Sequence, residues 1–417
     1  MYIRMYNGEF MRGEISMIKK PLSRRASRVH PSATLKIDTK FKRMLAEGID
    51  VVGFGAGEPD FDTPDYIKEA AYKAIAEGKT KYTPASGIYD LKVAVCHKFK
   101  CDNNLDYDPS QIVVSNGAKQ SLYNALSVLL NPGDEVILPA PFWVSYYELI
   151  QMAGGMPVIL AGKEENDFQI TKKQILDSIS ENTKAILLTN PNNPTGMMIS
   201  NELLEDIAKI CVENSIYVIS DEIYEKLVYD GIKHRSIASF GDDIKDLTIV
   251  VNGVSKTYAM TGWRIGYTAS NKEIASLMST YQSHCTSNPN TIAQYAALAA
   301  LSADDGSAER MKAEFIKRRN YMVERLNEMP YVSCRKPAGA FYVLMNVSKL
   351  FSKKYNGVQI ENATNLCDLL LDNVKLSLVP GDSFCAQDYV RWSYATSMEN
   401  IKKGLDRLEE FLTQVTD

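Results

Sequence analysis

The stretch that decides the fold is TIVVNGVSKTYAMTGWRIG, residues 248–266. Its first residues, Thr248 to Val251, form a short apolar run that is typical of a buried strand. The glycine and serine that follow bring Lys256 out at the end of this strand, and ligands collect at strand ends in α/β sheets. The stretch therefore predicts an α/β sheet with an amine at its ligand-binding edge.

Arg264 follows this lysine within the same stretch. A lysine amine can condense with an aldehyde, and a planar guanidinium suits a phosphate dianion. The pair favours an enzyme that uses pyridoxal 5'-phosphate, an aldehyde cofactor that carries a phosphate. The alternative is a surface lysine in a turn, which only agreement from other segments can exclude.

A second apolar strand, Ile216 to Ser220, ends at Asp221 and is followed by Tyr224. A carboxylate at that place can keep the pyridine nitrogen of the cofactor protonated, so that the ring accepts electrons from a carbanion. Tyr224 can donate to the phenolate oxygen of the cofactor. Taken alone, Asp221 is more simply explained as a helix N-cap, and only its partnership with Lys256 favours the cofactor role.

A rigid loop precedes Asp221 in the chain. The strand Ala185 to Thr189 runs into NPNNPTG, residues 190–196, whose prolines and glycine exclude a regular helix or a central strand. This loop, the Asp-x-x-Tyr pair and the Ser-Lys pair with its later arginine occur in this order in class I and II aminotransferases. The chain resembles that family, which belongs to the fold type I pyridoxal phosphate enzymes, from about Pro31 to the C-terminal helix.

Within the family, the chain is most similar to bacterial-type aspartate aminotransferases. The segments that carry this similarity are PSAT (31–34), AGEPDF (56–61), KY (81–82), WVSY (143–146) and RWSYATS (391–397). The resemblance implies a homodimer with shared active sites, in which Tyr82 reaches the phosphate bound by the neighbouring subunit.

The resemblance also implies roles for individual residues. The catalytic residues are Lys256, Asp221 and Tyr224. The cofactor-binding residues are Gly117, Ala118, Lys119, Trp143, Asn193, Asp221, Tyr224, Ser255, Lys256, Arg264 and Tyr82. The substrate-binding residues are Gly57, Trp143, Asn193, Arg391, Lys119, Ser32 and Thr34.

Three of these assignments also have an independent physical basis. Residues 115–119 (SNGAK) lie between a strand and a helix, where small residues and the helix dipole suit a phosphate, although an ordinary helix start explains them equally well. Trp143 can stack on the pyridine ring or can be a core aromatic residue. Arg391 can hold the substrate α-carboxylate through two parallel hydrogen bonds, or can form a surface ion pair.

The chain departs from the wider family at two places. Gly253 stands where many relatives carry a serine for the phosphate, and Ser255 is not a certain replacement. Residues 281–294 contain no arginine, although animal-type enzymes supply one there for the distal carboxylate. The resemblance to the bacterial-type enzymes implies that Lys119, with Ser32 and Thr34 nearby, meets that carboxylate instead.

The expected reaction is aspartate plus 2-oxoglutarate giving oxaloacetate plus glutamate. An aromatic, alanine or prephenate aminotransferase, or a lyase of the same fold, would keep nearly all these residues. A non-catalytic cofactor-binding regulator is the alternative from another class, although about thirty leading residues are too few for a usual DNA-binding domain.

Short β-rich runs alternate with helical patterns, which predicts a seven-stranded, mainly parallel sheet with helices on both faces. The runs are Ile112–Val114, Glu135–Leu138, Pro157–Leu160, Ala185–Thr189, Tyr217–Ser220, Thr248–Val251 and Ile265–Ala269. We expect residues 1–30 to be a flexible leader and residues 56–299 to be a large cofactor-binding domain. Residues 31–55 and 300–417 are expected to form a smaller α/β domain.

The composition is compatible with such an enzyme. With 417 residues, of which 45% are hydrophobic, the chain can bury a large core and a smaller one. Its net charge of -4 argues against nucleic acid as a partner, and no apolar run is long enough to cross a membrane. The seven cysteines are scattered, which favours reduced thiols in the cytoplasm, and the four histidines show no metal-binding spacing.

Overall fold

A seven-stranded sheet contains the apolar strand that precedes Lys256. In the computed structural model, which describes residues 23, 29 and 33–417 and the side chains of 23, 29 and 39–417, the strand order is β2-β8-β7-β6-β5-β3-β4. The strands are β2 (Ile112–Ser115), β3 (Glu135–Ala140), β4 (Met156–Ala161), β5 (Thr183–Thr189), β6 (Tyr217–Asp221), β7 (Thr248–Gly253) and β8 (Gly266–Ala269). The seven predicted strands are confirmed, with small differences at their ends.

The sheet is parallel from β4 to β7, and β8 runs antiparallel to both of its neighbours. In the parallel part, Thr189 of β5 pairs with Asp221 of β6, which pairs in turn with Val251 of β7. The carboxyl ends of these three strands therefore lie side by side. The loops that follow them open on the same edge of the sheet, where ligands bind in α/β proteins.

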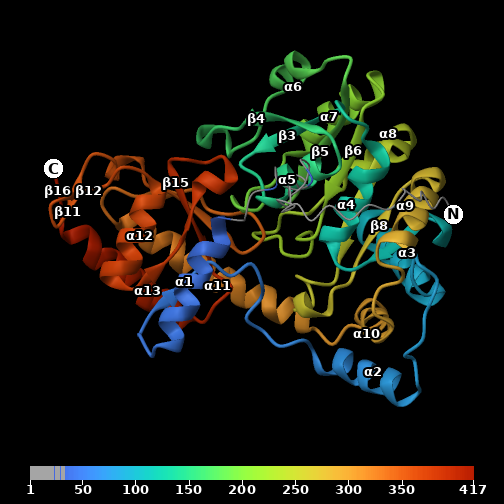
Figure 1. Ribbon diagram of the computed structural model, residues 1–417, viewed down its shortest axis with the longest axis horizontal. Coiled ribbons are helices and arrows are strands. Elements are labelled where there is room, and N and C mark those ends of the chain that lie inside the picture. The colour runs from blue at the N-terminus through green and yellow to red at the C-terminus, as the bar shows by residue number, and fades with distance from the viewer. Residues whose placement is uncertain (1–22, 24–28, 30–32) are drawn as a thin grey trace, which may run out of the picture.

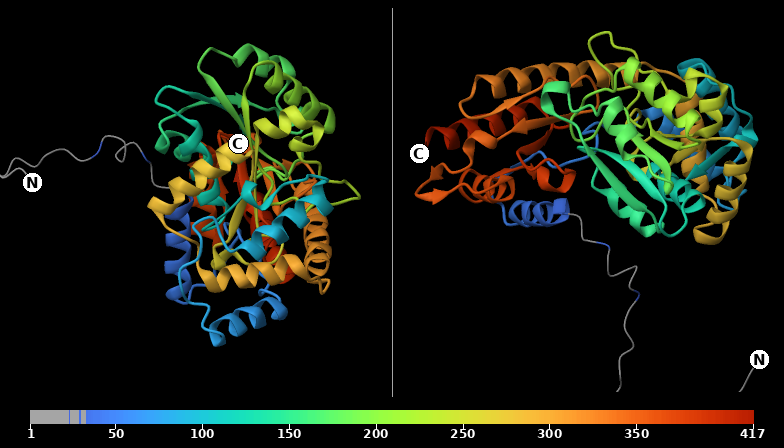
Figure 2. Two further views of the ribbon diagram at one scale, coloured as in Figure 1. Left: turned by 90° about the vertical axis from the view of Figure 1, so that its right-hand side faces the viewer. Right: turned by 90° about the horizontal axis from the view of Figure 1, so that it is seen from above.

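Helices cover both faces of this sheet (Figures 1 and 2). One face packs on α4 (Ala118–Leu129), α5 (Ser145–Met152) and α9 (Lys272–Cys285). The other packs on α3 (Tyr89–Asn103), α6 (Lys172–Ser178), α7 (Asn201–Glu213), α8 (Asp242–Leu247) and α10 (Thr291–Ser302), and α2 (Asp65–Ala76) lies outside α10. Successive strand residues alternate between the two cores, as Ile186 and Leu187 do, because side chains of a strand point to opposite faces.

A second lobe joins the beginning and the end of the described chain. Its helices are α1 (Ala33–Ala46), α11 (Ser307–Glu328), α12 (Ala363–Val374) and α13 (Met398–Thr413). Its main sheet has the order β14-β15-β10-β9, formed by Val379–Pro380, Tyr389–Ser393, Tyr342–Asn346 and Ser333–Cys334. The short strands β11 (Lys354–Tyr355), β12 (Val358–Gln359) and β16 (Val415–Thr416) form an outer sheet.

The N-terminal segment is attached to this lobe by strand pairing. Strand β1 (Val52–Gly53) pairs in parallel with β13 (Leu376–Ser377), and α1 lies against the same lobe in Figures 1 and 2. Apart from residues 23 and 29, the predicted leader lies outside the described residues. Among the helices that the structure describes, none is both long and apolar enough to span a bilayer.

Close packing at Gly404 of α13 fixes the segment that follows β1. A Cβ atom added at Gly404 would lie 2.3 Å from the ring of Phe54, which is 1% exposed. The Phe54 ring packs on Trp392 of β15 with centroids 4.6 Å apart, and the Phe54 carbonyl accepts a hydrogen bond from Ser393 N at 3.0 Å. Gly404 thus lets residues 54–57 lie directly against the strand that carries Arg391.

We expect Gly404→Ala to destabilise the protein by about 1–3 kcal/mol, because the added methyl group overpacks a buried aromatic pair. Helix propensity alone predicts the opposite sign, a gain of about 1 kcal/mol. Urea denaturation measures the difference. The control is Glu410→Ala at an exposed position of the same helix, which should change the free energy of unfolding by less than about 0.5 kcal/mol. A more stable Gly404→Ala protein would show that Phe54 can move aside.

Candidate active site

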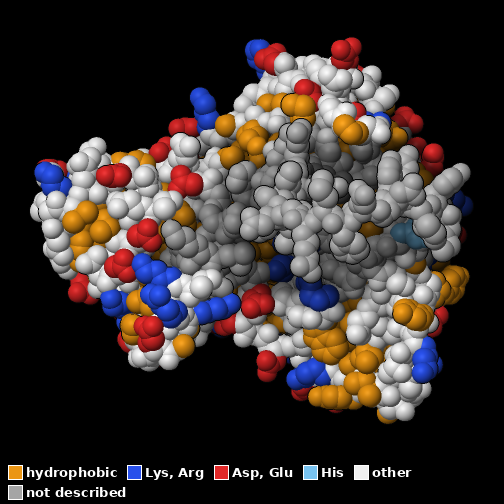
Figure 3. All heavy atoms as spheres, viewed as in Figure 1, with side chains coloured by type: hydrophobic (Ala, Val, Ile, Leu, Met, Phe, Trp, Pro, Cys, Tyr) orange, Lys and Arg blue, Asp and Glu red, His pale blue; other side chains and the backbone are white. Residues whose placement is uncertain are grey.

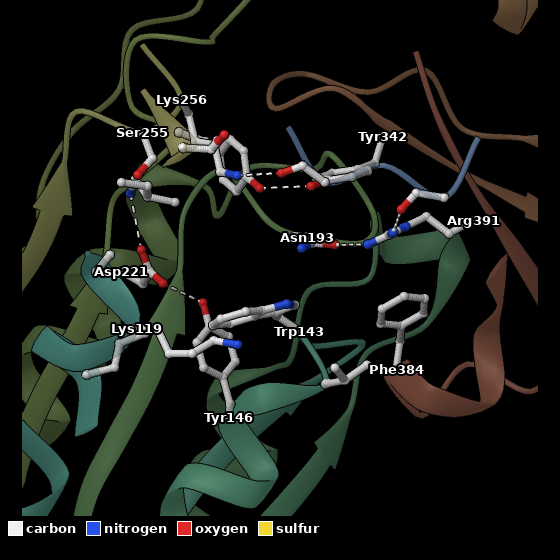
Figure 4. Close-up of a pocket in the computed structure, with 18 of the residues that line it drawn as sticks. Lys119, Trp143, Tyr146, Asn193, Asp221, Ser255, Lys256, Tyr342, Phe384 and Arg391 are labelled. Carbon is white, nitrogen blue, oxygen red and sulfur yellow. Dashed lines mark hydrogen bonds between the residues drawn. The ribbon is translucent and has the colours of Figure 1, made fainter. Parts of the chain in front are cut away.

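A cavity of about 350 Å³ opens at the carboxyl ends of β5, β6 and β7, between the two lobes. It brings together most of the residues that the sequence singled out (Figure 4). The predicted residues that line it are Gly57, Ala118, Lys119, Trp143, Asn193, Asp221, Tyr224, Ser255, Lys256, Arg264 and Arg391. Residues far apart in the chain therefore share one site, which a surface lysine in a turn would not do.

Lys256 projects into this cavity from the loop after β7, and its Nζ donates to the carbonyl oxygen of Gly57. Burial lowers the pKa of Lys256 to about 8; Glu58 raises it and the positive charge of Arg264 lowers it further. A sizeable fraction of the amine is therefore unprotonated near pH 8. Only the unprotonated amine can attack a carbonyl or accept a proton.

Asp221 is buried at the end of β6, and burial raises the pKa of its carboxyl group to about 6. Its Oδ2 accepts a hydrogen bond from the hydroxyl of Tyr146 at 2.7 Å, and its Oδ1 accepts one from Ile223 N at 3.2 Å. The contact with Ile223 closes a local turn, and no helix begins there, so the helix N-cap that was the alternative for Asp221 is wrong. The carboxylate nevertheless lines the cavity, so it serves more than this turn (Figure 4).

An anion cradle lies at the start of α4. The Arg264 guanidinium donates to Thr261 O at 2.9 Å and to Asn116 O at 3.3 Å. A Cβ atom at Gly117, where φ is +81°, would lie 2.2 Å from this guanidinium. Glycine therefore permits the arginine to lie against the turn, beside the first amides of a helix, which have no acceptor within the helix.

The glycine that departs from the family pattern has a steric explanation. A Cβ atom at Gly253 would lie 2.9 Å from Ile265 O and 3.0 Å from Gly266 Cα on the adjacent strand. A serine cannot be placed there without a shift of the backbone. Ser255 lines the cavity and offers the nearby hydroxyl instead.

Arg391 lies on β15 and is 5% exposed. Its terminal nitrogens donate to Asn193 Oδ1 and to Gly55 O, each at 3.0 Å. The rings of Tyr342 and Phe384 lie 4.6 and 4.9 Å from its Cζ. Ion pairs recorded among the described residues do not include Arg391, so the surface ion pair that was its alternative is wrong. Its charge is left available for an anionic ligand.

Lys119 and Trp143 line the wall of the cavity nearest to α4 and α5. The Nζ of Lys119 lies 4.7 Å from the centroid of the Trp143 ring. Burial, and then the charge of Arg264, lower the pKa of Lys119. The indole is partly buried and meets Tyr146 edge to face, with centroids 5.4 Å apart, so it is held in place and still faces the cavity.

Four predicted residues are not among the described residues that line this cavity. Gly117 lies behind it, against the Arg264 guanidinium. Tyr82 lies on the surface with 89% of its area exposed. Ser32 lies outside the described residues, and Thr34 belongs to α1 but its side chain is not described.

Sequence reasoning missed three aromatic residues that line the cavity, Tyr146, Tyr342 and Phe384. The hydroxyl of Tyr342 lies 3.0 Å from that of Tyr224, so it holds a predicted catalytic side chain. Tyr146 occurs in the segment WVSY, which the sequence analysis quoted, but no spacing in that segment indicates which side chain the tyrosine meets.

Behind Asp221, a buried polar cluster contains Glu222, Glu225 and His234, whose donor atoms lie within 4.8 Å of one another. The histidine spacing in the sequence gave no sign of this cluster. Lys98 pairs with Glu225 and, against the effect of burial, holds the pKa of Glu225 at about 2. Because the lysine already supplies a cation, we assign no metal to these described residues.

The fold and the cavity together are those of an aminotransferase. Residues 49–408 match the model of the family aminotransferase class I and II, and the chain belongs to that family. The aspartate aminotransferase of Bacillus sp. (strain YM-2) is 45% identical over 395 residues, covering 95% of this chain and 100% of that protein. The probable aspartate/prephenate aminotransferase of Aquifex aeolicus is 44% identical over 400 residues, covering 95% of this chain and 100% of its own.

Solved structures agree with this membership. The aspartate aminotransferase from Rhizobium meliloti superposes with a TM-score of 0.92 at 37% identity, covering 95% of this chain and 100% of that one. The aspartate aminotransferase from Thermus thermophilus with maleate gives a TM-score of 0.89 at 40% identity, covering 94% and 100%. The predicted family and fold are confirmed.

The elevated pKa of Asp221 predicts how the apo protein responds to pH. The pKa lies near 6 in the folded chain and near 3.8 in a model peptide, so ionisation opposes folding. As pH rises from 4 to 7, the wild type should lose about 2 kcal/mol of unfolding free energy relative to Asp221→Asn, which cannot ionise. Urea denaturation across this pH range measures the difference. Parallel curves for the two proteins would show that Asp221 is not perturbed.

Proposed function

We propose that this protein is a pyridoxal phosphate aminotransferase that converts L-aspartate and 2-oxoglutarate into oxaloacetate and L-glutamate. The main support is the meeting of Lys256, Asp221 and Arg391 at one cavity, although two come from strand ends of the large sheet and the third lies within β15 of the second lobe. Relatives at 45% identity are aspartate aminotransferases, and a solved relative is described with maleate, a dicarboxylate.

The residues present fit the cofactor. The cradle at Gly117 suits its phosphate through the Arg264 guanidinium and the first amides of α4. The buried carboxylate of Asp221 suits the ring nitrogen, and the Trp143 indole suits the ring face. Asn193 and Tyr224 would meet the phenolate oxygen, because the oxygen of the Asn193 amide already faces Arg391 and its nitrogen remains free for the cavity (Figure 4). When bound, the cofactor supplies an aldehyde that takes up the amino group and a ring that withdraws electrons from the substrate Cα.

The chain contributes binding and proton transfer. Arg391 takes the α-carboxylate through two parallel hydrogen bonds, with its plane fixed between the rings of Tyr342 and Phe384. This grip orients the Cα–H bond of the substrate toward Lys256. Because its pKa is lowered to about 8, the Nζ of Lys256 can remove the Cα proton and later return a proton as general acid.

Lys256→Ala should leave a folded protein that binds the cofactor weakly and has no transaminase activity. Borohydride should fix the cofactor covalently to the wild type but not to the variant, because no other amine replaces Lys256. Mass spectrometry of the treated proteins measures this, with the exposed Lys173→Ala as a control that behaves like the wild type. Cofactor fixed to Lys256→Ala would contradict the assignment, and a wild type that binds cofactor without transaminating would favour the regulator.

The choice of aspartate depends on Lys119. Residues 281–294 contain no arginine, and Lys119 is a cation on the cavity wall, 4.7 Å from the Trp143 ring. We propose that its ammonium meets the side-chain carboxylate of the donor, with Ser32 and Thr34 as further contacts. A point charge on a flexible stem accepts donors of two lengths, aspartate and glutamate. Prephenate is a second candidate acceptor, since several relatives are described as aspartate/prephenate aminotransferases.

Lys119→Ala should lower kcat/KM for aspartate and glutamate. The loss should correspond to about 1.5–3 kcal/mol of transition-state binding, the scale of a charged hydrogen bond. Neutral aromatic donors should be spared, because they have no second carboxylate to lose. Steady-state kinetics measure kcat/KM of both proteins with acidic donors and with neutral aromatic donors. An equal loss for acidic and neutral donors would mean that Lys119 serves only the phosphate.

We further propose a cytoplasmic homodimer in which Tyr82 completes the neighbouring site. Apolar side chains are exposed around α2, including Tyr72 at 69% and Ile75 at 52%, and orange side chains gather there in Figure 3. Such a patch marks an interaction surface. The seven cysteines are free, which agrees with a reducing compartment. In this proposal residues 56–299 are the large domain, and residues 31–55 and 300–417 are the small domain.

A further inference from the structure

A chain of hydrogen bonds leads from β5 through α5 to Asp221. The Thr189 hydroxyl donates to the Tyr146 hydroxyl oxygen at 2.7 Å, and Tyr146 donates to Asp221 Oδ2 at 2.7 Å. All three side chains are buried. A tyrosine hydroxyl has one proton, and since the lone pair of Tyr146 receives the proton of Thr189, its own proton is directed at Asp221.

The groups that face Asp221 have opposing effects. Burial disfavours the carboxylate, and the charge of Glu222 behind it does the same. The hydrogen bond from Tyr146 is the strongest influence that favours the carboxylate, ahead of the Ile223 amide and the charge of Lys256. Tyr224 also lies close enough to Asp221 for the two side chains to interact electrostatically. Tyr146 is therefore the main group on the described chain that keeps this carboxylate ionised.

We propose that Tyr146 is a positioning residue whose hydroxyl keeps Asp221 charged, so that this carboxylate can hold a proton on the ring nitrogen of the cofactor. The inference rests on the proposed function. Without the hydroxyl, Asp221 becomes a stronger base and takes that proton for itself. The ring then loses the charge that makes it accept electrons.

A purely packing role for Tyr146 predicts something different. Its ring meets Trp143 edge to face, and phenylalanine keeps that contact while removing only the hydroxyl. Tyr146→Phe therefore separates the proposed electrostatic role from support of the indole. Tyr147→Phe makes the same chemical change at the next residue of α5, which packs on the apolar core beside this helix.

The first measurement is the stability of the full-length apo protein as a function of pH. Tyr146→Phe should raise the upper limit of the pH range in which stability is lost by about one to two units, the scale of a hydrogen bond to a charged group, while the lower limit stays at the pKa of the unfolded chain. Tyr147→Phe should leave this range unchanged. Equal titrations for Tyr146→Phe and the wild type would overturn the proposal.

The second measurement uses the holoenzyme. In Tyr146→Phe, kcat for aspartate should fall about ten- to a hundredfold, the factor that one to two pH units represent, while KM changes little. The pH dependence of the absorption of the bound cofactor should shift with it. A rise in KM together with a fall in kcat, without a spectral shift, would indicate that the substrate is misplaced and would overturn the proposal.

A double-mutant cycle tests whether the effect passes through Asp221. In the Asp221→Asn background, removal of the Tyr146 hydroxyl should no longer change the pH dependence of apo stability. An effect of the same size in both backgrounds would overturn the proposal. If Tyr146→Phe does not fold, Thr189→Val tests the same chain, because loss of its donor weakens the bond to Asp221. It should give a smaller shift in the same direction, and no shift would overturn the proposal.

These outcomes are distinct from failure of the proposed function. Absence of cofactor binding and transamination in the wild type would contradict the proposed function. The apo titration would still report whether Tyr146 controls the charge of Asp221. Conversely, an active wild type with an unshifted Tyr146→Phe titration would leave the function in place and remove only the role of Tyr146.

Discussion

The parallel register of β5, β6 and β7 is the constraint on which the site depends. Thr189 pairs with Asp221, and Asp221 with Val251, so three strand ends deliver their side chains to one edge. Side chains alternate between the faces of a sheet, and a slip of one residue would exchange them. Asp221 would then point into the cluster behind the sheet, where Glu222 lies between Ser220 and Ser236. The apolar pattern of β6 therefore determines which of two adjacent carboxylates meets the cavity.

The second lobe supplies the other half of the site. Arg391 comes from β15 and reaches across to Asn193 in the loop after β5 and to Gly55 in the N-terminal segment. This reach is possible because the backbone of residues 54–57 lies close to β15, and that closeness depends on the absence of a side chain at Gly404. The position of the Arg391 guanidinium is thus coupled to packing in both lobes.

Much of the site could be predicted from the sequence because its residues follow the ends of recognisable strands. Lys256, Asp221 and Asn193 follow recognisable apolar strands, and such strands in an α/β sheet can be read from their composition. Tyr146, Tyr342 and Phe384 could not be assigned in this way, because their roles come from tertiary contacts between segments remote in the chain.

Burial and neighbouring side chains, rather than residue type, distinguish each predicted role from its alternative. Arg391 is not a surface ion pair, since it is 5% exposed between two rings. The capping alternative for Asp221 is wrong, because a turn and not a helix follows it, although the carboxylate does accept a local bond from Ile223 N. The departure at Gly253 looked like a lost phosphate contact from the sequence alone. The structure adds that β8 leaves no room for a larger residue there.

The charges that line the cavity are unequal, and this inequality bears on the ligands that it accepts. Burial lowers the pKa of Lys119, Lys256 and Arg391, which means that each cation is less favourable here than in water. Asp221 is the buried anion among these side chains, and Arg264 adds a further positive charge. A phosphate dianion with a dicarboxylic amino acid would balance this excess, whereas a neutral amino acid would leave the charge of Lys119 unpaired. The same electrostatic imbalance that destabilises the apo protein therefore favours an acidic substrate once the phosphate is in place.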